Sequence, residues 1–232
     1  MTDLEEVLED EHVEFPVVDG ETVFSGRVWD VARDTVAYGE GTITREYVRH
    51  GGAVAVVAID DEDRVLLIKQ YRHPVRSRLW EVPAGLLDIA GEPPLAAVQR
   101  ELAEEADVQA SQWSVLAEYY TTPGSSSEAI RIYLARGITP TGETFARHDE
   151  EADMEVRWVP LADAVDAVLA RRIQNPSLVV GLLAAEAARA RGWRTLGAAD
   201  EPWARHPGTV HPGVARVKGA VPGAGDAESG GR

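Results

Sequence analysis

The chain has 232 residues and no cysteine, and its 23 basic and 39 acidic residues leave a formal net charge of −16. Without cysteine there is no disulfide, no thiolate zinc site and no cysteine nucleophile. The negative charge argues against a nucleic acid as a partner, because a polyanion would be repelled. A chain of this length with 44% hydrophobic residues can bury a full core, and it favours one domain with appendages or a small pair of domains.

The two ends of the chain carry no core-forming pattern. Residues 1–12 form an acidic leader, and residues 194–232 are rich in Gly, Ala and Pro without a period, which favours a disordered tail. The leader is acidic where a signal peptide is basic and then apolar, and no apolar run reaches membrane-spanning length. We therefore expect no membrane association and a cytoplasmic location.

Residues 13–50 alternate between apolar and polar side chains, with turn signals at Asp19-Gly20 and at Gly39. This pattern predicts a small N-terminal antiparallel β-sheet region that precedes the rest of the chain. In residues 51–193, the apolar runs 53–59 and 65–69 flank a turn at 60–63, which predicts a hairpin buried on both faces at the centre of a sheet. Further strands are expected at 113–120, 129–136 and 154–159, and helices at 161–171 and 178–193, so the fold class is α/β.

A helix is expected to begin at Pro93 and Pro94, because proline suits the first helical turn. On this helix Glu101, Glu104 and Glu105 share one face, where like charges repel by ~0.2–0.5 kcal/mol a pair. A hard divalent cation such as Mg²⁺, which prefers oxygen ligands, would turn this repulsion into attraction. The alternative is a solvated face, which acidic helices often have.

Basic side chains gather just before this acidic helix, in the segment KQYRHPVRSRLW at residues 69–80. Arginine offers a planar fork that fits phosphate oxygens at two points, so arginines beside metal-binding carboxylates favour a phosphate site. A solvated loop is the alternative interpretation of the same composition.

Two loops follow the helix. Residues 121–128, TTPGSSSE, form a polar connection with a turn signal at Pro123-Gly124. The acidic run at residues 149–153 is by itself typical of a solvated loop, but a loop carboxylate near a metal could remove the proton from an attacking water.

Residues 85–108, GLLDIAGEPPLAAVQRELAEEADV, resemble the Nudix box, G-x5-E-x7-R-E-U-x-E-E-x-G-U, where U is an apolar residue. Glu92 comes after six residues instead of five, and Asp107 replaces the late glycine. Asp tolerates the left-handed conformation at a helix end better than most residues do. Neither departure touches the metal-ligand positions.

The segments KQYRHP, WEVPAGLLD and YYTTPGSSSEAIRIYLA extend the resemblance, over residues 13–193, to the ADP-ribose pyrophosphatase branch of Nudix hydrolases. In that branch a proline at the position of Pro123 accompanies ADP-ribose specificity. The resemblance implies a Nudix α/β/α sandwich with a mixed sheet over residues 51–193, and an N-terminal sheet over residues 13–50 that is exchanged between the subunits of a homodimer. It also implies hydrolysis of ADP-ribose to AMP and ribose 5-phosphate with Mg²⁺, or alternatively Mn²⁺.

The resemblance also implies roles in catalysis. The metal ligands would be the backbone carbonyl of Ala84 and the carboxylates of Glu101, Glu104 and Glu105. Arg100 would orient these carboxylates by charge-assisted hydrogen bonds, with a plain i,i+4 surface pair as the alternative. The general base would come from the acidic loop, and we favour Glu150 over Glu151.

The implied substrate contacts come from several segments. Arg72 would hold the diphosphate or its neighbouring ribose, and Glu81 would lie near the terminal ribose. Arg45 would contact the adenine of the substrate bound to the partner subunit, and Trp29 is a second platform for the base.

Two other functions share this box. One is a pyrophosphatase for another nucleotide sugar or dinucleotide, such as GDP-mannose. The other, less favoured, is a non-catalytic Nudix-like ADP-ribose sensor. Such sensors tend to lose box carboxylates and to carry a DNA-binding winged helix, whereas this chain keeps all three glutamates and has an acidic remainder.

Overall fold

The computed structural model describes residues 8–145 and 153–206. The elements in chain order are β1 (Val17–Ser25), β2 (Asp30–Tyr38), β3 (Gly41–Arg49), β4 (Ala53–Ala58), β5 (Arg64–Arg72), the 3-10 turn η1 (His73–Val75), β6 (Ser77–Glu81), β7 (Ala84–Leu86), α1 (Pro94–Ala106), β8 (Val108–Tyr120), β9 (Ala129–Pro140), β10 (Glu155–Pro160), α2 (Leu161–Leu169), α3 (Pro176–Ala190) and β11 (Gly197–Ala198).

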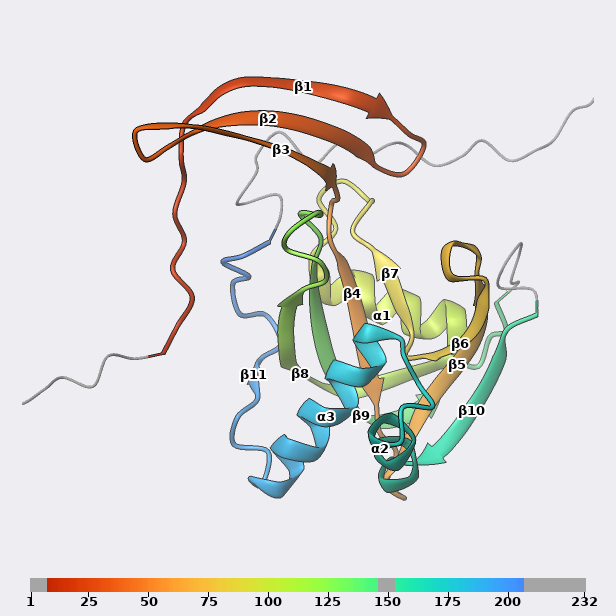
Figure 1. The fold of residues 1–232 in the computed structure, drawn as a ribbon. Helices are drawn as coiled ribbons and strands as arrows, with labels where there is room; N and C mark the ends of the chain where they lie inside the picture. Colours follow the sequence, from red (N-terminus) through yellow and green to blue (C-terminus); the bar gives the residue numbers. More distant parts are fainter. Residues whose placement is uncertain (1–7, 146–152, 207–232) are drawn as a thin grey trace, which may run out of the picture.

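Within the described residues the strands form three sheets, with orders β1-β2-β3, β10-β5-β6 and β11-β8-β9-β4-β7 (Figure 1). In the largest sheet β9 runs parallel to β4 and antiparallel to β8. The sheet is therefore mixed, and the predicted α/β fold class is confirmed.

The core lies on both faces of β4, whose six residues are all buried. On one face Val54 and Val56 belong to a cluster that includes Leu102 of α1. On the other face Ala55 and Val57 pack in a cluster with residues of α2 and α3. A strand covered by helices on both sides has no solvent face, which explains why its sequence is a continuous apolar run.

The predicted pairing of residues 53–59 with residues 65–69 in a hairpin is wrong. The two strands belong to different sheets, and among the described residues the bridge pairing between their segments is the isolated one of Ile59 with Val65. β4 pairs with β7 and β9, while β5 pairs with β6 and β10. A continuous apolar run is compatible with any buried neighbour, so the sequence pattern alone does not determine the partner strand.

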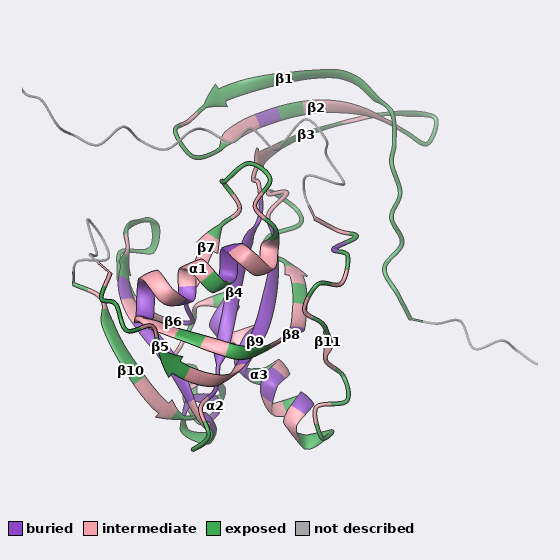
Figure 2. Cartoon of the chain, turned by 180° about the vertical axis from the view of Figure 1, so that it is seen from behind, coloured by how far each residue is buried: buried purple, intermediate pink, exposed green. Residues whose placement is uncertain are grey.

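The N-terminal sheet β1-β2-β3 stands at one end of the molecule (Figure 1). Every residue of β1 is exposed (Figure 2). The sheet meets the rest of the chain at the end of β3, where Val48 forms a parallel bridge with Ser126.

The chain beyond α3 departs from the expected tail. β11 pairs with β8, and Trp203 is only 8% exposed and lies beneath the guanidinium of Arg131, 5.1 Å from its ring centroid. Packed structure therefore continues past residue 194 to at least Trp203, because a single tryptophan buries enough apolar surface to hold a short segment in place. None of the helices in the described ranges is long and apolar enough to cross a membrane.

Candidate active site

α1 carries the candidate catalytic carboxylates, and its bounds follow from its sequence. Pro93 is its extended N-cap and Pro94 its first residue. At the other end Asp107 adopts the left-handed conformation, with φ 55°, and its N–H donates to the carbonyl of Ala103 at 2.9 Å. Val98 and Leu102 fill the buried side of α1, which fixes the rotation of the helix about its axis.

Glu105 is the buried carboxylate of the site, only 4% exposed. Its Oε2 accepts a hydrogen bond of 2.9 Å from the backbone N–H of Ala84 in β7. This bond joins the helix to the strand that carries the carbonyl of Ala84, the backbone metal ligand expected from the sequence. The two predicted ligands are therefore brought together.

Gly85 makes room for a second box carboxylate. A methyl group placed on Gly85 would lie 2.0 Å from Oε1 of Glu101, which is far inside van der Waals contact. Only glycine allows the backbone of β7 to approach Glu101 this closely.

Arg100 is bonded to three carboxylates. Its Nε and Nη2 donate to the two oxygens of Glu92 at 3.1 and 3.0 Å, and its Nη1 donates to Oε1 of Glu101 at 2.7 Å and Oε2 of Glu104 at 3.0 Å. The hydrogen bonds to Glu92, followed by the negative charge of Glu101, raise the pKa of Arg100, so its charge is permanent. This network is more than an i,i+4 surface pair, because it orders the loop and the helix together.

The donor set suits a hard divalent cation, since it consists of carboxylate and carbonyl oxygens at a backbone cradle that a Cβ would fill. Within residues 8–145 and 153–206 no three Asp, Glu or His side chains converge closely enough to hold an ion. Glu101 and Glu104 do not converge with Glu105 because both accept hydrogen bonds from Arg100. A carboxylate has two oxygens and can bond to arginine through one and to a cation through the other.

Arg72 and Glu81 form a two-point ion pair at the candidate phosphate site. Nε and Nη2 of Arg72 donate to the two carboxylate oxygens of Glu81 at 3.0 and 2.7 Å. Glu81 is 2% exposed and also accepts from the side-chain amide of Gln70 at 3.4 Å. Glu81 therefore orients Arg72, whose side chain keeps 41% of its surface exposed.

Other basic residues of the same segment lie beside β10. Arg78 donates to the carbonyl of Asp153 at 2.6 Å, and both Arg78 and Lys69 lie 3.8 Å from Oε1 of Glu155. The candidate bases Glu150 and Glu151 lie outside the described residues.

The remaining predicted substrate residues lie away from the box. Pro123 lines a cavity of about 290 Å³ whose lining includes Trp203 but no residue of α1 or β7. Trp29 lies in the connection from β1 to β2. Arg45 lies on β3, where its side chain donates to the carbonyl of Thr44 at 2.9 Å. Within the described residues, the candidate metal ligands thus come together at α1 and β7 and Arg72 pairs with Glu81, whereas these three residues lie elsewhere.

Sequence reasoning missed the partners of these residues. It placed Glu92 in the box without a role, although Glu92 anchors Arg100. It also passed over His50 and Glu128, whose nitrogen and oxygen lie 3.4 Å apart between the N-terminal sheet and the Pro123 loop. A histidine between a strand end and two glycines was the available signal for a constrained junction.

A mixed sheet between helices, with a glycine-bounded strand packed on a helix of the pattern R-E-x-x-E-E, defines the class of Nudix hydrolases. The model of the NUDIX domain matches residues 49–178, and the chain belongs to this family.

The chain is also similar to individual known proteins. The chain is 47% identical over 175 residues to an ADP-ribose pyrophosphatase of Mycobacterium tuberculosis, covering 75% of this chain and 84% of the relative. It is 36% identical to a methanol dehydrogenase activator of Bacillus methanolicus, covering 70% of this chain and 87% of the relative. The fold is similar to the crystal structure of an ADP compounds hydrolase, with a TM-score of 0.65 and 23% identity, covering 79% of this chain and 99% of the other.

Proposed function

We propose that this protein hydrolyses the diphosphate of ADP-ribose, giving AMP and ribose 5-phosphate, with Mg²⁺ as its cation and Mn²⁺ as a substitute. The observation that carries the proposal is the complete box: Arg100 bonded to Glu92, Glu101 and Glu104, with Glu105 buried against Ala84. The substrate rests on the 47% identity to an ADP-ribose pyrophosphatase over most of both chains.

The residues of the site have separate roles in the proposed reaction. Arg72, oriented by Glu81, presents its exposed guanidinium to the phosphate oxygens and neutralises charge as it develops. Glu101, Glu104, Glu105 and the carbonyl of Ala84 would hold the cation, which supplies charge neutralisation and a bound water of lowered pKa. Arg100 fixes the carboxylates in place.

The chemical step is the attack of water on one phosphorus of the diphosphate. A P–O bond to the bridging oxygen breaks, and that oxygen leaves with the other phosphate. We assign the removal of the water proton to Glu150, with Glu151 as the second candidate, since a carboxylate suits a general base.

We further propose that the protein acts in the cytoplasm as a homodimer that exchanges its N-terminal sheets. In the single chain this sheet leaves several large apolar side chains exposed: Val17, Val18, Val23, Phe24, Val28, Trp29 and Tyr38. A partner sheet or domain would cover such a surface. Exchange would also carry Arg45 and Trp29 to the adenine of the substrate in the other subunit, which explains why they lie away from the box of their own chain.

The test is a substrate panel with product analysis. Purified protein is incubated with ADP-ribose, GDP-mannose and NAD-type dinucleotides in Mg²⁺, in Mn²⁺ and in chelator, and initial rates are compared. We expect ADP-ribose to give the highest kcat/KM and equal amounts of AMP and ribose 5-phosphate, with no product in chelator. A higher rate with GDP-mannose would favour the second candidate, because the box recognises the diphosphate and not the sugar. Binding of ADP-ribose without turnover would favour a sensor.

A further inference from the structure

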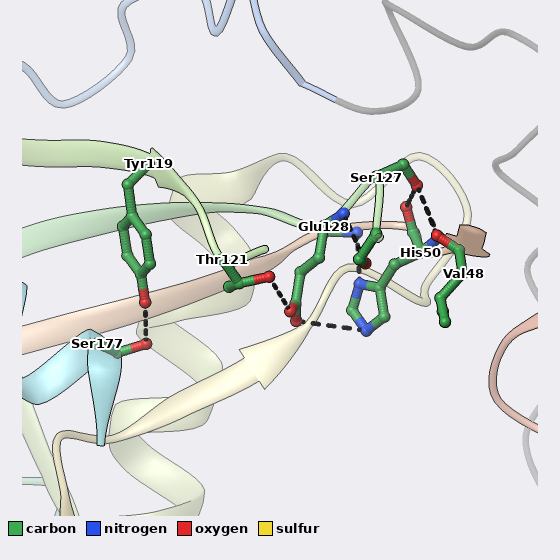
Figure 3. Close-up of polar contacts among 9 residues, drawn as sticks. Val48, His50, Tyr119, Thr121, Ser127, Glu128 and Ser177 are labelled. Carbon is green, nitrogen blue, oxygen red and sulfur yellow. Dashed lines mark hydrogen bonds and ion pairs between the residues drawn. The ribbon is translucent and has the colours of Figure 1, made fainter. Parts of the chain in front are cut away.

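The loop of residues 121–128 holds the end of β3 by backbone hydrogen bonds. The N–H of Val48 donates to the carbonyl of Ser125 at 2.9 Å, and the N–H of Ser127 donates to the carbonyl of Val48 at 3.0 Å. The N–H of His50 then donates to the hydroxyl of Ser127 at 2.9 Å (Figure 3). The loop that carries Pro123 is therefore joined directly to the strand that leaves the N-terminal sheet.

Glu128 and His50 lie at the centre of this junction (Figure 3). The hydroxyl of Thr121 donates to Oε2 of Glu128 at 2.7 Å, and Nε2 of His50 lies 3.4 Å from Oε1. The N–H of Gly52 donates to Nδ1 of His50 at 3.1 Å. Because a backbone N–H can only donate, Nδ1 is the acceptor and the ring proton is on Nε2, facing the carboxylate.

The same imidazole connects to the strand of the metal site. The carbonyl of Gly52 accepts from the N–H of Leu87 at 3.1 Å, and Ala53 pairs with Leu86 at the end of β7. Gly85 and Ala84 precede Leu86 by one and two residues; Gly85 lies close against Glu101, and the N–H of Ala84 donates to Glu105. The short strand β7 therefore connects this junction to the backbone of Ala84 and Gly85, which lies beside α1.

On its other side His50 faces the N-terminal sheet. The ring of Trp29 lies with its centroid 6.2 Å from that of His50, tilted by 36°. The side chain of His50 is only 10% exposed and that of Glu128 25%, so the pair sits inside the junction and not on an open surface. A buried pair with several hydrogen bonds allows few alternative arrangements of the groups that it joins.

We propose that Glu128 and His50 are positioning residues that set the N-terminal sheet and the Pro123 loop relative to the box. This inference rests on the proposed function, in which Trp29 of the exchanged sheet contacts the nucleotide bound to the other subunit and the carboxylates of α1 hold the cation. Loosening the junction would displace the contacts to the nucleotide and leave the box carboxylates held by Arg100. The pair therefore governs substrate affinity more than the chemical step.

The kinetic test uses Glu128→Ala with Glu128→Gln as the conservative variant. We expect Glu128→Ala to raise KM for ADP-ribose about tenfold with kcat changed by less than about threefold. Glu128→Gln should recover most of the affinity, because its amide oxygen still accepts from His50 and its amide nitrogen donates to the hydroxyl of Thr121. The control is Asp60→Asn, which alters a partly buried carboxylate bonded to Arg64 in the turn between β4 and β5. The proposal is overturned if KM stays unchanged, if only kcat falls, or if the control shifts KM equally.

A second measurement needs no substrate. Hydrogen–deuterium exchange of the wild type and Glu128→Ala should show faster exchange at residues 48–52 and 121–128 in the variant, unchanged exchange at residues 84–87, and no change at any of these residues in Asp60→Asn. Unchanged exchange at residues 48–52 and 121–128 in Glu128→Ala would overturn the structural link. If the wild type does not hydrolyse ADP-ribose, the proposed function fails on its own, and the exchange data still decide whether the pair fixes the junction.

Discussion

Glu92 and Arg100 form a two-point ion pair between the loop that precedes α1 and the helix itself, with both nitrogen–oxygen distances close to 3 Å. The additional residue that separates Glu92 from the glycine of the box does not move it out of reach. Because Arg100 also binds Glu101 and Glu104, this pair determines where the box carboxylates point.

We predict that Glu92→Ala lowers both activity and stability. Arg100 loses its strongest partner, so its guanidinium is free to shift with Glu101 and Glu104 still attached. The expected loss is about tenfold or more in kcat/KM and about 1 kcal/mol in the free energy of unfolding, since the pair is partly exposed. Initial rates and urea denaturation measure both. Glu62→Ala, which removes an exposed carboxylate beside Arg64, is the control. Equal losses in the two variants would remove any special role for Glu92.

Glu105→Gln is predicted to abolish turnover with the fold retained. The amide oxygen of glutamine still accepts from the N–H of Ala84, so the contact between α1 and β7 survives, but the negative charge is lost. We expect kcat to fall by at least about a hundredfold and the thermal stabilisation by Mg²⁺ to disappear. Thermal unfolding with and without Mg²⁺ checks the second effect. Glu40→Gln, at an exposed turn, serves as the matched control. Normal turnover in folded Glu105→Gln would refute the metal role.

Gly85→Ala tests the backbone cradle. The added methyl group would meet Oε1, Cδ and Cγ of Glu101, all within 2.4 Å, so either Glu101 or β7 must move. We expect about tenfold or greater loss of kcat, because small displacements of catalytic groups are costly. Gly41→Ala is the control, since no atom lies within 4 Å of its added methyl group. Equal rates in the two variants would show that Glu101 does not need this position.

The extent to which the sequence predicts this structure depends on how local the signal is. The start of α1 at Pro94 and the left-handed Asp107 at its end were both predicted, because proline and the residue after a helix act through their own backbone angles. The pairing of β4 with β9 was not predicted. The paired residues are more than seventy positions apart, and an apolar run does not specify which strand it pairs with.

The candidate site shows the same division. The box glutamates were recognised from their spacing, but the partners of Arg72 and Arg100 depend on how strands and loops fold back. Glu81, which the resemblance places near the terminal ribose, is buried and accepts a hydrogen bond from Arg72, a contact that the sequence pattern does not reveal. Trp203 falls in the segment that was expected to be a disordered tail. The composition of that segment does not reveal that the ring of Trp203 packs under Arg131 of β9.

His50 makes the stability of the junction depend on pH. Burial lowers the pKa of its imidazole below the ordinary value of 6.5, although the negative charge of Glu128 opposes the shift. A group with a lowered pKa in the folded state binds protons more readily when unfolded, so its contribution is complete above pH 6.5 and decreases as pH falls below that value. Protonation of Nδ1 would also break the bond from Gly52.

We therefore predict that the wild type loses more stability between about pH 7.5 and about pH 5.5 than His50→Gln does. Urea denaturation at both pH values measures the difference. Burial also lowers the pKa of His206, helped by the positive charge of Arg131, but His206 is present in both proteins and cancels in the comparison. Equal pH dependence in the two proteins would contradict this assignment.

The proposed exchange of N-terminal sheets leads to a complementation experiment. Arg45 lies on β3, apart from the box of its own chain, so in an exchanged dimer each active site takes Arg45 from one subunit and Glu105 from the other. Arg45→Glu and Glu105→Gln should each be nearly inactive alone. After the two are mixed, unfolded and refolded together, about a quarter of the sites would combine both native residues. We expect activity to return to about that fraction of the wild type. Light scattering confirms the dimeric mass, and Arg45→Glu refolded alone is the control. A dimeric mixture that stays inactive would show that Arg45 acts within its own subunit or not at all.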